Sequence, residues 1–90
     1  MGIRILIYGR EGEGSAQAAM SQVRALIGEM RIDASVQMVT DPSMLTMNGV
    51  DNPPAISVDG SFISNGWVPS RNEIVRALNS RLSQIDNAKH

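Results

Sequence analysis

Residues 49–60, Gly-Val-Asp-Asn-Pro-Pro-Ala-Ile-Ser-Val-Asp-Gly, are the stretch from which the rest of the sequence is best interpreted. Pro53-Pro54 removes two backbone donors and fixes two φ angles, so no helix passes through this point. The apolar run at residues 55–58 predicts a buried strand, and Asp59-Gly60 predicts a tight hairpin turn before residues 61–64. A proline at the entry to a buried strand is tolerated where its missing N–H is not needed, commonly at the first residue.

A strand-helix-strand pattern precedes this stretch. Residues 3–8 are β-rich and nearly continuously apolar, as expected for a central strand covered on both faces. Residues 9–14 contain three glycines and form a loop. Ser15 is expected to cap a helix over residues 16–30, in which apolar positions recur every three or four residues. Residues 34–39 alternate between apolar and polar and predict a second strand.

Two further helices are marked by their caps. Asp41-Pro42 combines an N-cap residue with proline at the first helical position, and Asn48-Gly49 closes this short helix. Residues 70–73, Ser-Arg-Asn-Glu, form a capping box that begins the last helix. We expect a single domain over residues 1–86, with residues 87–90 as a frayed tail.

The predicted order is therefore β-α-β-α-β-β-α. A strand-helix-strand opening followed by a hairpin and a closing helix predicts an α/β domain, with a mixed four-stranded sheet flanked by helices on both faces.

Composition excludes several classes of function. The 90 residues carry a net charge of −1, which gives no electrostatic case for binding nucleic acid or an anionic membrane. There is no cysteine, so the chain has no disulfide, no thiolate nucleophile and no thiolate ligand for a metal. No apolar run nears the 18 residues of a membrane span. The default expectation is a soluble cytoplasmic protein without a cofactor.

The order of elements, with a proline entering the third strand, resembles the thioredoxin fold. It is most similar to the small, glutaredoxin-sized redox-active disulfide proteins. Their pattern is a first strand, a Gly-Cys-x-x-Cys turn, Gly-Val-x-x-x-Pro-Ala, an apolar strand, Asp-Gly, and then Gly-x-Val-Pro-Ser before the last helix. The matching residues here are Gly49-Val50, Pro54-Ala55, Asp59-Gly60 and Gly66-Trp67-Val68-Pro69-Ser70, within a resemblance that covers residues 3 to about 82. The resemblance implies a cis peptide bond before Pro54, facing the loop that precedes the first helix.

This sequence departs from the family at two places. The cysteines should fall near Arg10 or Glu11 and near Glu13 or Gly14, and neither is present. Thiol–disulfide exchange needs one thiolate to attack and a second to resolve, so this polypeptide alone cannot perform it, and we predict no catalytic residue. In the family, the residue before the cis-proline offers its N–H and C=O to an extended bound peptide. Pro53 has no N–H to offer.

The resemblance therefore implies a non-catalytic interaction module that uses the face of the former active site. Its partner would be a protein or peptide segment, or a second copy of the chain. The expected site residues are Arg10, Glu11, Gly12, Glu13, Gly14, Asp51, Asn52, Pro53, Pro54 and Trp67. An alternative is an electron-transfer relative that depends on cysteines supplied by a partner. Trp67 could anchor a partner or simply cover the edge of the core.

Three interpretations compete for the acidic loop. Glu11 and Glu13 lie at a helix N-terminus, where negative charge is stabilised, and a self-capping turn is the favoured interpretation. A second alternative joins them with Asp51 in a weak site for Ca²⁺ or Mg²⁺, but the spacing matches no known metal loop, so no metal ligand is predicted. Gly12 and Gly14 lack the rest of any phosphate-binding motif, which disfavours nucleotide binding.

Overall fold

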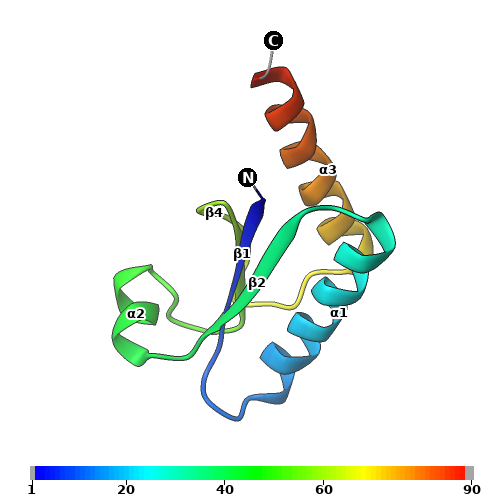
Figure 1. Ribbon diagram of the computed structural model, residues 1–90. Coiled ribbons are helices and arrows are strands. Elements are labelled where there is room, and N and C mark those ends of the chain that lie inside the picture. Colours follow the sequence, from blue (N-terminus) through cyan, green and yellow to red (C-terminus); the bar gives the residue numbers. More distant parts are fainter. Residues whose placement is uncertain (1, 89–90) are drawn as a thin grey trace.

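The structure is a computed structural model that describes residues 2–88, and within this range the chain forms four strands and three helices (Figure 1). In chain order the elements are β1 (Ile3–Tyr8), α1 (Gly14–Met30), β2 (Ala34–Val39), α2 (Pro42–Met47), β3 (Ala55–Val58), β4 (Ser61–Asn65) and α3 (Arg71–Ala88). This is the β-α-β-α-β-β-α order that the sequence predicts.

The four strands form one mixed sheet in the order β2-β1-β3-β4. β1 pairs in parallel with β2 and antiparallel with β3, and β3 pairs antiparallel with β4. Ile7 of β1 lies opposite Met38 on one side and Ile56 on the other. The nearly continuous apolar sequence of β1 thus follows from its central position between two strands. The prediction that both of its faces are covered is only partly correct, because Arg4 is exposed and Leu6 is half-buried on the second face.

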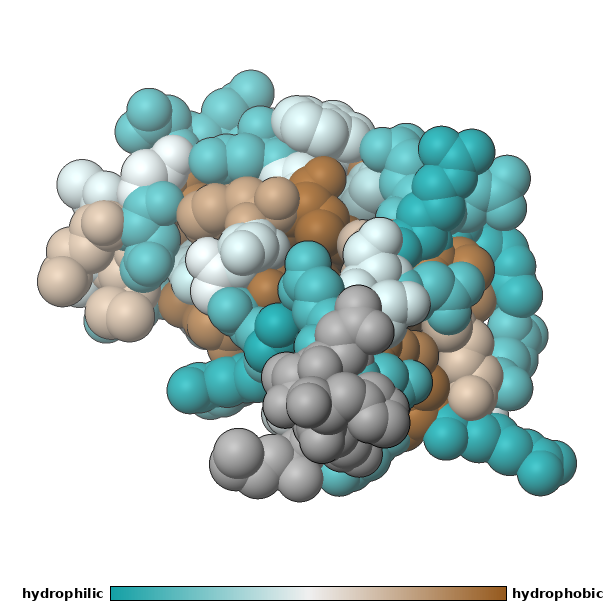
Figure 2. Space-filling model, turned by 90° about the horizontal axis from the view of Figure 1, so that it is seen from above, coloured by the Kyte–Doolittle hydropathy of each residue, from teal (hydrophilic) through white to brown (hydrophobic). Residues whose placement is uncertain are grey.

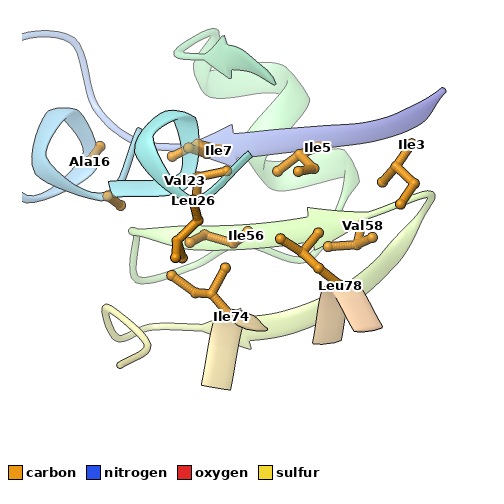
Figure 3. Close-up of a cluster of buried hydrophobic side chains, with 11 residues drawn as sticks. Ile3, Ile5, Ile7, Ala16, Val23, Leu26, Ile56, Val58, Ile74 and Leu78 are labelled. Atoms are coloured by element: carbon orange, nitrogen blue, oxygen red, sulfur yellow. The ribbon is translucent and has the colours of Figure 1, made fainter. Parts of the chain in front are cut away.

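The main core lies between one face of this sheet and the helices α1 and α3, which both cover that face in Figure 1. Alternate residues of β1 and β3 point into it and meet the apolar stripes of the two helices, as Figure 3 shows for Ile5, Val58, Val23 and Leu78. The outer sides of both helices are largely polar. No helix within residues 2–88 combines the length and the apolar character needed to cross a lipid bilayer.

The opposite face of the sheet is covered only at one end, where α2 packs. Leu45 of this helix joins Tyr8, Val50 and Ala55 in a second, smaller cluster of buried side chains. The helix has only six residues, so most of its surface faces solvent. In Figure 2 apolar atoms form the left edge of the molecule, where α2 lies, and Met47 is 80% exposed.

The turns and caps follow local sequence rules. Asp59 and Gly60 both have positive φ angles, 47° and 89°, as a two-residue hairpin of the predicted kind requires. The Ser43 hydroxyl and N–H donate to the Asp41 carboxylate at 2.8 and 3.0 Å, and these hydrogen bonds lower the pKa of Asp41. The capping box of α3 is reciprocal, because Glu73 N–H donates to Ser70 Oγ and Ser70 N–H donates to Glu73 Oε1, both at 3.2 Å.

Two predicted boundaries differ from the structure. α1 begins at Gly14 with Glu13 as its N-cap, so Ser15 is not the cap. The reason is local: the Ser15 hydroxyl donates its hydrogen to Glu13 Oε1 at 2.8 Å and does not accept from the helix. At the other end, α3 continues to Ala88, so residues 87 and 88 of the expected tail are helical, while residues 89–90 lie outside the described residues.

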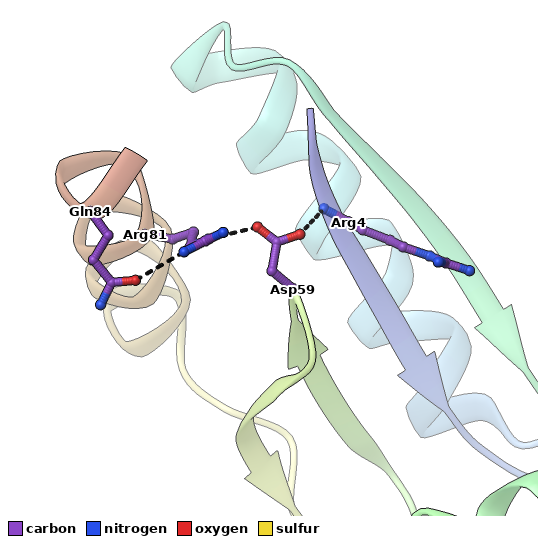
Figure 4. Close-up of polar contacts among 4 residues, drawn as sticks. All are labelled: Arg4, Asp59, Arg81 and Gln84. Atoms are coloured by element: carbon purple, nitrogen blue, oxygen red, sulfur yellow. Dashed lines mark hydrogen bonds and ion pairs between the residues drawn. The ribbon is translucent and has the colours of Figure 1, made fainter. Parts of the chain in front are cut away.

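Asp59, in the turn between β3 and β4, forms hydrogen bonds with both β1 and α3 (Figure 4). Its two carboxylate oxygens accept from Arg4 N–H at 2.8 Å and from Arg81 Nε at 2.6 Å. The Arg4 hydrogen bond is the largest cause that holds the pKa of Asp59 below its usual value. The hydrogen bond and charge of Arg81 add to it, against a partial opposing effect of burial. Because the folded pKa lies below the unfolded value of about 3.9, Asp59 stabilises the fold above that pH. This contribution is lost as the pH falls through the folded pKa.

Asp59→Asn is expected to lower the free energy of unfolding by about 1–2 kcal/mol at pH 7 and by progressively less toward pH 2. Asparagine tolerates the positive φ and can still accept from Arg4 N–H, so the substitution mainly removes the charge that faces Arg81. Urea unfolding of both proteins across this pH range measures the difference. Asp86→Asn, on the exposed surface of α3, is the matched control and should show no such trend. A difference for Asp59→Asn that does not change with pH would contradict the account.

Candidate functional site

The loop between β1 and α1 is closed on itself by Glu13. The Glu13 N–H donates to the Arg10 carbonyl at 3.0 Å, which makes residues 10–13 a turn. Gly12 within this turn has a positive φ of 78°. The Glu13 carboxylate accepts from Arg10 N–H at 3.2 Å and from the Ser15 hydroxyl at 2.8 Å. Glu13 thus satisfies its own loop, but it does so without the side-chain cap of α1 that the favoured interpretation of a self-capping turn requires. Its side chain makes no hydrogen bond to the N-terminal N–H groups of α1.

The two glutamates of this loop differ in role, so their substitutions should differ in effect. Glu13→Ala is expected to lower the free energy of unfolding by about 1 kcal/mol, because the loop loses two hydrogen bonds to a carboxylate. Glu11→Ala should change it by less than about 0.5 kcal/mol, since within the described residues the Glu11 side chain makes no hydrogen bond or ion pair. Urea unfolding checks both values. Equal effects for the two variants would contradict the assignment.

The segment between α2 and β3 forms the second wall of the site. It leaves α2 through Gly49, whose φ is 75°, and Val50 N–H donates to the Leu45 carbonyl at 2.8 Å. The peptide bond between Pro53 and Pro54 is cis, and both prolines are buried. The Pro54 carbonyl accepts from Gly66 N–H at 2.9 Å, which ties this segment to the start of the β4–α3 connection.

The two loops and α2 enclose a hollow of about 440 Å³ on the surface. Its lining residues are Arg10, Glu11, Thr40, Pro42, Leu45, Thr46, Val50, Asp51 and Pro53. The buried members of this set are apolar, whereas the charged and hydroxyl side chains are exposed. Within the described part of the chain, the charged side chains of Arg10, Glu11 and Asp51 form no ion pair. The hollow therefore offers an apolar base and a rim with one positive and two negative groups.

The structure brings only some of the predicted site residues into this hollow. Arg10, Glu11, Asp51 and Pro53 line it. The other predicted residues of the two loops do not contribute to its lining, namely Gly12, Glu13, Gly14, Asn52 and Pro54. Trp67 also lies outside the lining. It follows Gly66, whose N–H is bonded to Pro54, and its side chain is 51% exposed.

Sequence reasoning missed the contribution of the β2–α2 connection and of α2 itself. Thr40, Pro42, Leu45 and Thr46 line the hollow together with Val50. A usable signal exists in the order of elements, because β1 and β2 are parallel and their carboxyl ends meet at one edge of the sheet. Residues that directly follow the two strands, such as Arg10 and Thr40, must then lie close together.

The acidic residues do not form a metal centre. Glu11 and Asp51 both line the hollow, but the Glu13 carboxylate is occupied by Arg10 N–H and by Ser15. Across residues 2–88, no group of three or more histidine, cysteine, aspartate or glutamate side chains is arranged to hold a metal ion. The geometry gives no support to the cation alternative.

Comparison with known families decides the identity of the fold. The family model described as a thioredoxin domain matches residues 3–79, which include every strand, both loops of the hollow and the first half of α3. The chain belongs to this thioredoxin-domain family. A search of curated proteins finds no match to the chain.

Membership of the thioredoxin-domain family makes the composition of the β1–α1 loop informative. The matched range includes the loop to which the sequence resemblance assigns the Cys-x-x-Cys positions, and this loop reads Gly-Arg-Glu-Gly-Glu-Gly. The chain has no cysteine at any of its 90 positions. Because exchange of a disulfide needs sulfur atoms on the protein, this thioredoxin-domain chain cannot perform it by itself.

Proposed function

We propose that this protein is a non-catalytic thioredoxin-domain module that binds an extended segment of another protein in the hollow between α2, the β1–α1 loop and the segment before β3. The observation that carries the proposal is the hollow itself. It is lined in part by the β1–α1 loop, where the sequence resemblance would place the reactive cysteines. The chain has no cysteine, and the charged side chains of the hollow are unpaired within the described residues.

The size and lining of the hollow support a peptide ligand. At about 440 Å³ it falls within the range of about 300–1,000 Å³ that is typical of ligand sites. Leu45, Val50 and Pro53 provide an apolar base for one side chain of the bound segment. Arg10 and Asp51 on the rim can then pair with an acidic and a basic group beside it, which fixes the direction of the segment.

Side chains are expected to contribute more to this recognition than the backbone. Pro53 has no N–H, so it can offer a bound strand only its carbonyl. One missing hydrogen bond weakens binding by a net amount of about 0.5–1.5 kcal/mol, which does not prevent it. The selectivity of the site then rests on the rim charges and on the threonine hydroxyls.

Selection from a random peptide display library on the immobilised protein tests the proposal. Peptides that are enriched should bind the protein in solution, as measured by calorimetry. Arg10→Ala/Glu11→Ala/Asp51→Ala should weaken their binding at least about tenfold, which corresponds to 1.4 kcal/mol.

The matched control removes the same number of charges of each sign from α1 and α3, on the other side of the sheet. This variant, Glu29→Ala/Arg76→Ala/Asp86→Ala, should bind as the original protein does. The hollow would be rejected as the binding site if the enriched peptides bound Arg10→Ala/Glu11→Ala/Asp51→Ala as tightly as the original protein. A selection that enriches no peptide would also reject it.

A further inference from the structure

A different surface, the outer edge of β2, carries a second inference. Among the strands of residues 2–88, β2 is the last one on its side of the sheet and pairs only with β1. Ile3 N–H donates to the Asp33 carbonyl at 2.9 Å, and Gly9 N–H donates to the Val39 carbonyl at 3.1 Å. In a parallel ladder alternate residues bond to the neighbouring strand, so the odd-numbered residues of this segment bond to β1. The N–H and C=O groups of the even-numbered residues, Ala34, Val36 and Met38, therefore point outward.

This edge lacks the features by which proteins keep strand edges from pairing. Between Ala34 and Val39 the sequence contains no charge, no proline and no glycine, and the pairing with β1 runs without a bulge. The opposite edge of the sheet is different, because the pairing of β4 with β3 shifts register between Ile56 and Ser57. Bulges of this kind twist an edge away from partners, whereas a regular uncharged edge is a ready template for another strand.

We propose that β2 pairs antiparallel with β2 of a second copy of this chain, about a two-fold axis that passes through Val36. This register opposes Val36 with its own equivalent and Ala34 with Met38 of the second copy. Each of these pairs exchanges two hydrogen bonds, about six in all, so every outward N–H and C=O of β2 is used. The two four-stranded sheets then form one continuous sheet.

Half-buried apolar side chains on α1, beside β2, are also placed to contact a second copy. On α1, Glu29 makes an ion pair with Arg71 of α3, while Ile27 lies about 200° around the helix from Glu29, on the flank away from α3. Ile27 and Met20 are only half-buried there. A two-fold axis perpendicular to the sheet places both α1 helices on the same face, so these apolar flanks meet and become covered.

Polar groups fit the same register. Ser35 and Gln37, on the other face of the sheet, lie opposite each other across the axis. This self-complementarity of hydrogen bonds and apolar flanks is why the occupant is a second copy and not an unrelated strand.

Analytical ultracentrifugation of the full chain tests the dimer, which should sediment with twice the mass of the 9.7 kDa monomer. Val36→Pro should give a monomer, because proline removes an outward N–H while the bonds of β2 to β1 use other residues. Val36→Thr keeps that N–H and the shape of the side chain, so it should remain dimeric. A chain that is monomeric up to about 1 mM, or a dimer that Val36→Pro leaves intact, would overturn the proposal.

A cross-link tests the register without relying on the proline variant. The chain has no cysteine, so Ser35→Cys and Gln37→Cys can be prepared as separate single variants. Opposed non-hydrogen-bonded residues have Cα atoms about 4.5 Å apart, which is within disulfide range. After oxidation, an equal mixture of the two variants should form a covalent dimer, and either variant alone should form far less. Equal cross-linking in all three samples, or none in any, would overturn the register.

Discussion

Gly9→Ala is expected to lower the free energy of unfolding by about 3 kcal/mol, because Gly9 is buried at the end of β1. A Cβ atom at residue 9 would lie 2.4 Å from the Cβ of Ala16, which is buried in the first turns of α1. Two such atoms need about 3.5–4.0 Å, so α1 must move away from the end of β1. That movement would also displace the loop at residues 10–13, which forms one side of the hollow.

Two companion variants separate this clash from a general effect of alanine. Gly9→Ala/Ala16→Gly removes the clashing methyl group and should recover most of the loss, leaving a deficit of about 1 kcal/mol from glycine within a helix. Gly28→Ala adds a methyl group to α1 where no atom lies within 4 Å, and it should stabilise the protein by up to about 1 kcal/mol. Denaturant unfolding measures all three. A Gly9→Ala protein as stable as the original would show that the close approach of α1 to β1 is not required.

Arg10→Cys/Glu13→Cys is expected to give this chain the thiol–disulfide exchange that it lacks. The hydrogen bond from Glu13 N–H to the Arg10 carbonyl makes a turn, in which the first and fourth Cα atoms lie less than about 7 Å apart. That separation is within reach of a disulfide. A thiol at residue 13 would sit at the N-cap of α1, where the helix lowers the thiol pKa. If the pKa of this thiol falls from about 8.5 to about 7.5, the fraction of thiolate at neutral pH rises roughly tenfold.

The measurement is reduction of insulin with dithiothreitol as the electron source. The double variant should exceed the rate with dithiothreitol alone about tenfold, and the original chain should match that rate. Each single variant is a control, because one thiol can attack a disulfide but cannot release the mixed disulfide that results. If the oxidised double variant does not lose two hydrogens by mass spectrometry, the loop does not hold residues 10 and 13 in the required geometry.

Most of the fold could be predicted because its decisive residues act locally. Asp59-Gly60 takes the two positive φ angles of a tight hairpin, and the capping box over residues 70–73 acts through its own side chains. Asp41-Pro42 likewise caps α2 through contacts within three residues. The central position of β1 follows from its apolar sequence. In each case the sequence contains both partners of the interaction within a few positions.

The start of α1 could not be predicted because two neighbouring polar residues compete. Ser15 is a common N-cap residue, but its hydroxyl hydrogen is taken by the Glu13 carboxylate, and the turn at residues 10–13 makes Glu13 the cap. The outcome depends on where a carboxylate two positions away points. Cap preferences of single residues do not contain that information.

The candidate site was half predictable for a related reason. Arg10, Glu11, Asp51 and Pro53 follow from the family pattern, since they belong to the two loops that face each other. The contribution of the β2–α2 connection depends on the order of strands in the sheet, which local sequence does not fix. The family pattern also predicts Trp67 in this cleft, but Trp67 lies outside the lining and its side chain is half exposed.

The central claim is that the hollow binds a peptide segment, and a peptide titration followed by NMR tests it most directly. A peptide selected on the protein would be added to ¹⁵N-labelled protein while the amide shifts are recorded. The account predicts concentration-dependent shifts at residues 10–11, 40–46 and 50–52, with little change along the outer surfaces of α1 and α3. Shifts centred on those helices or on the β4 edge, with the hollow unchanged, would contradict it.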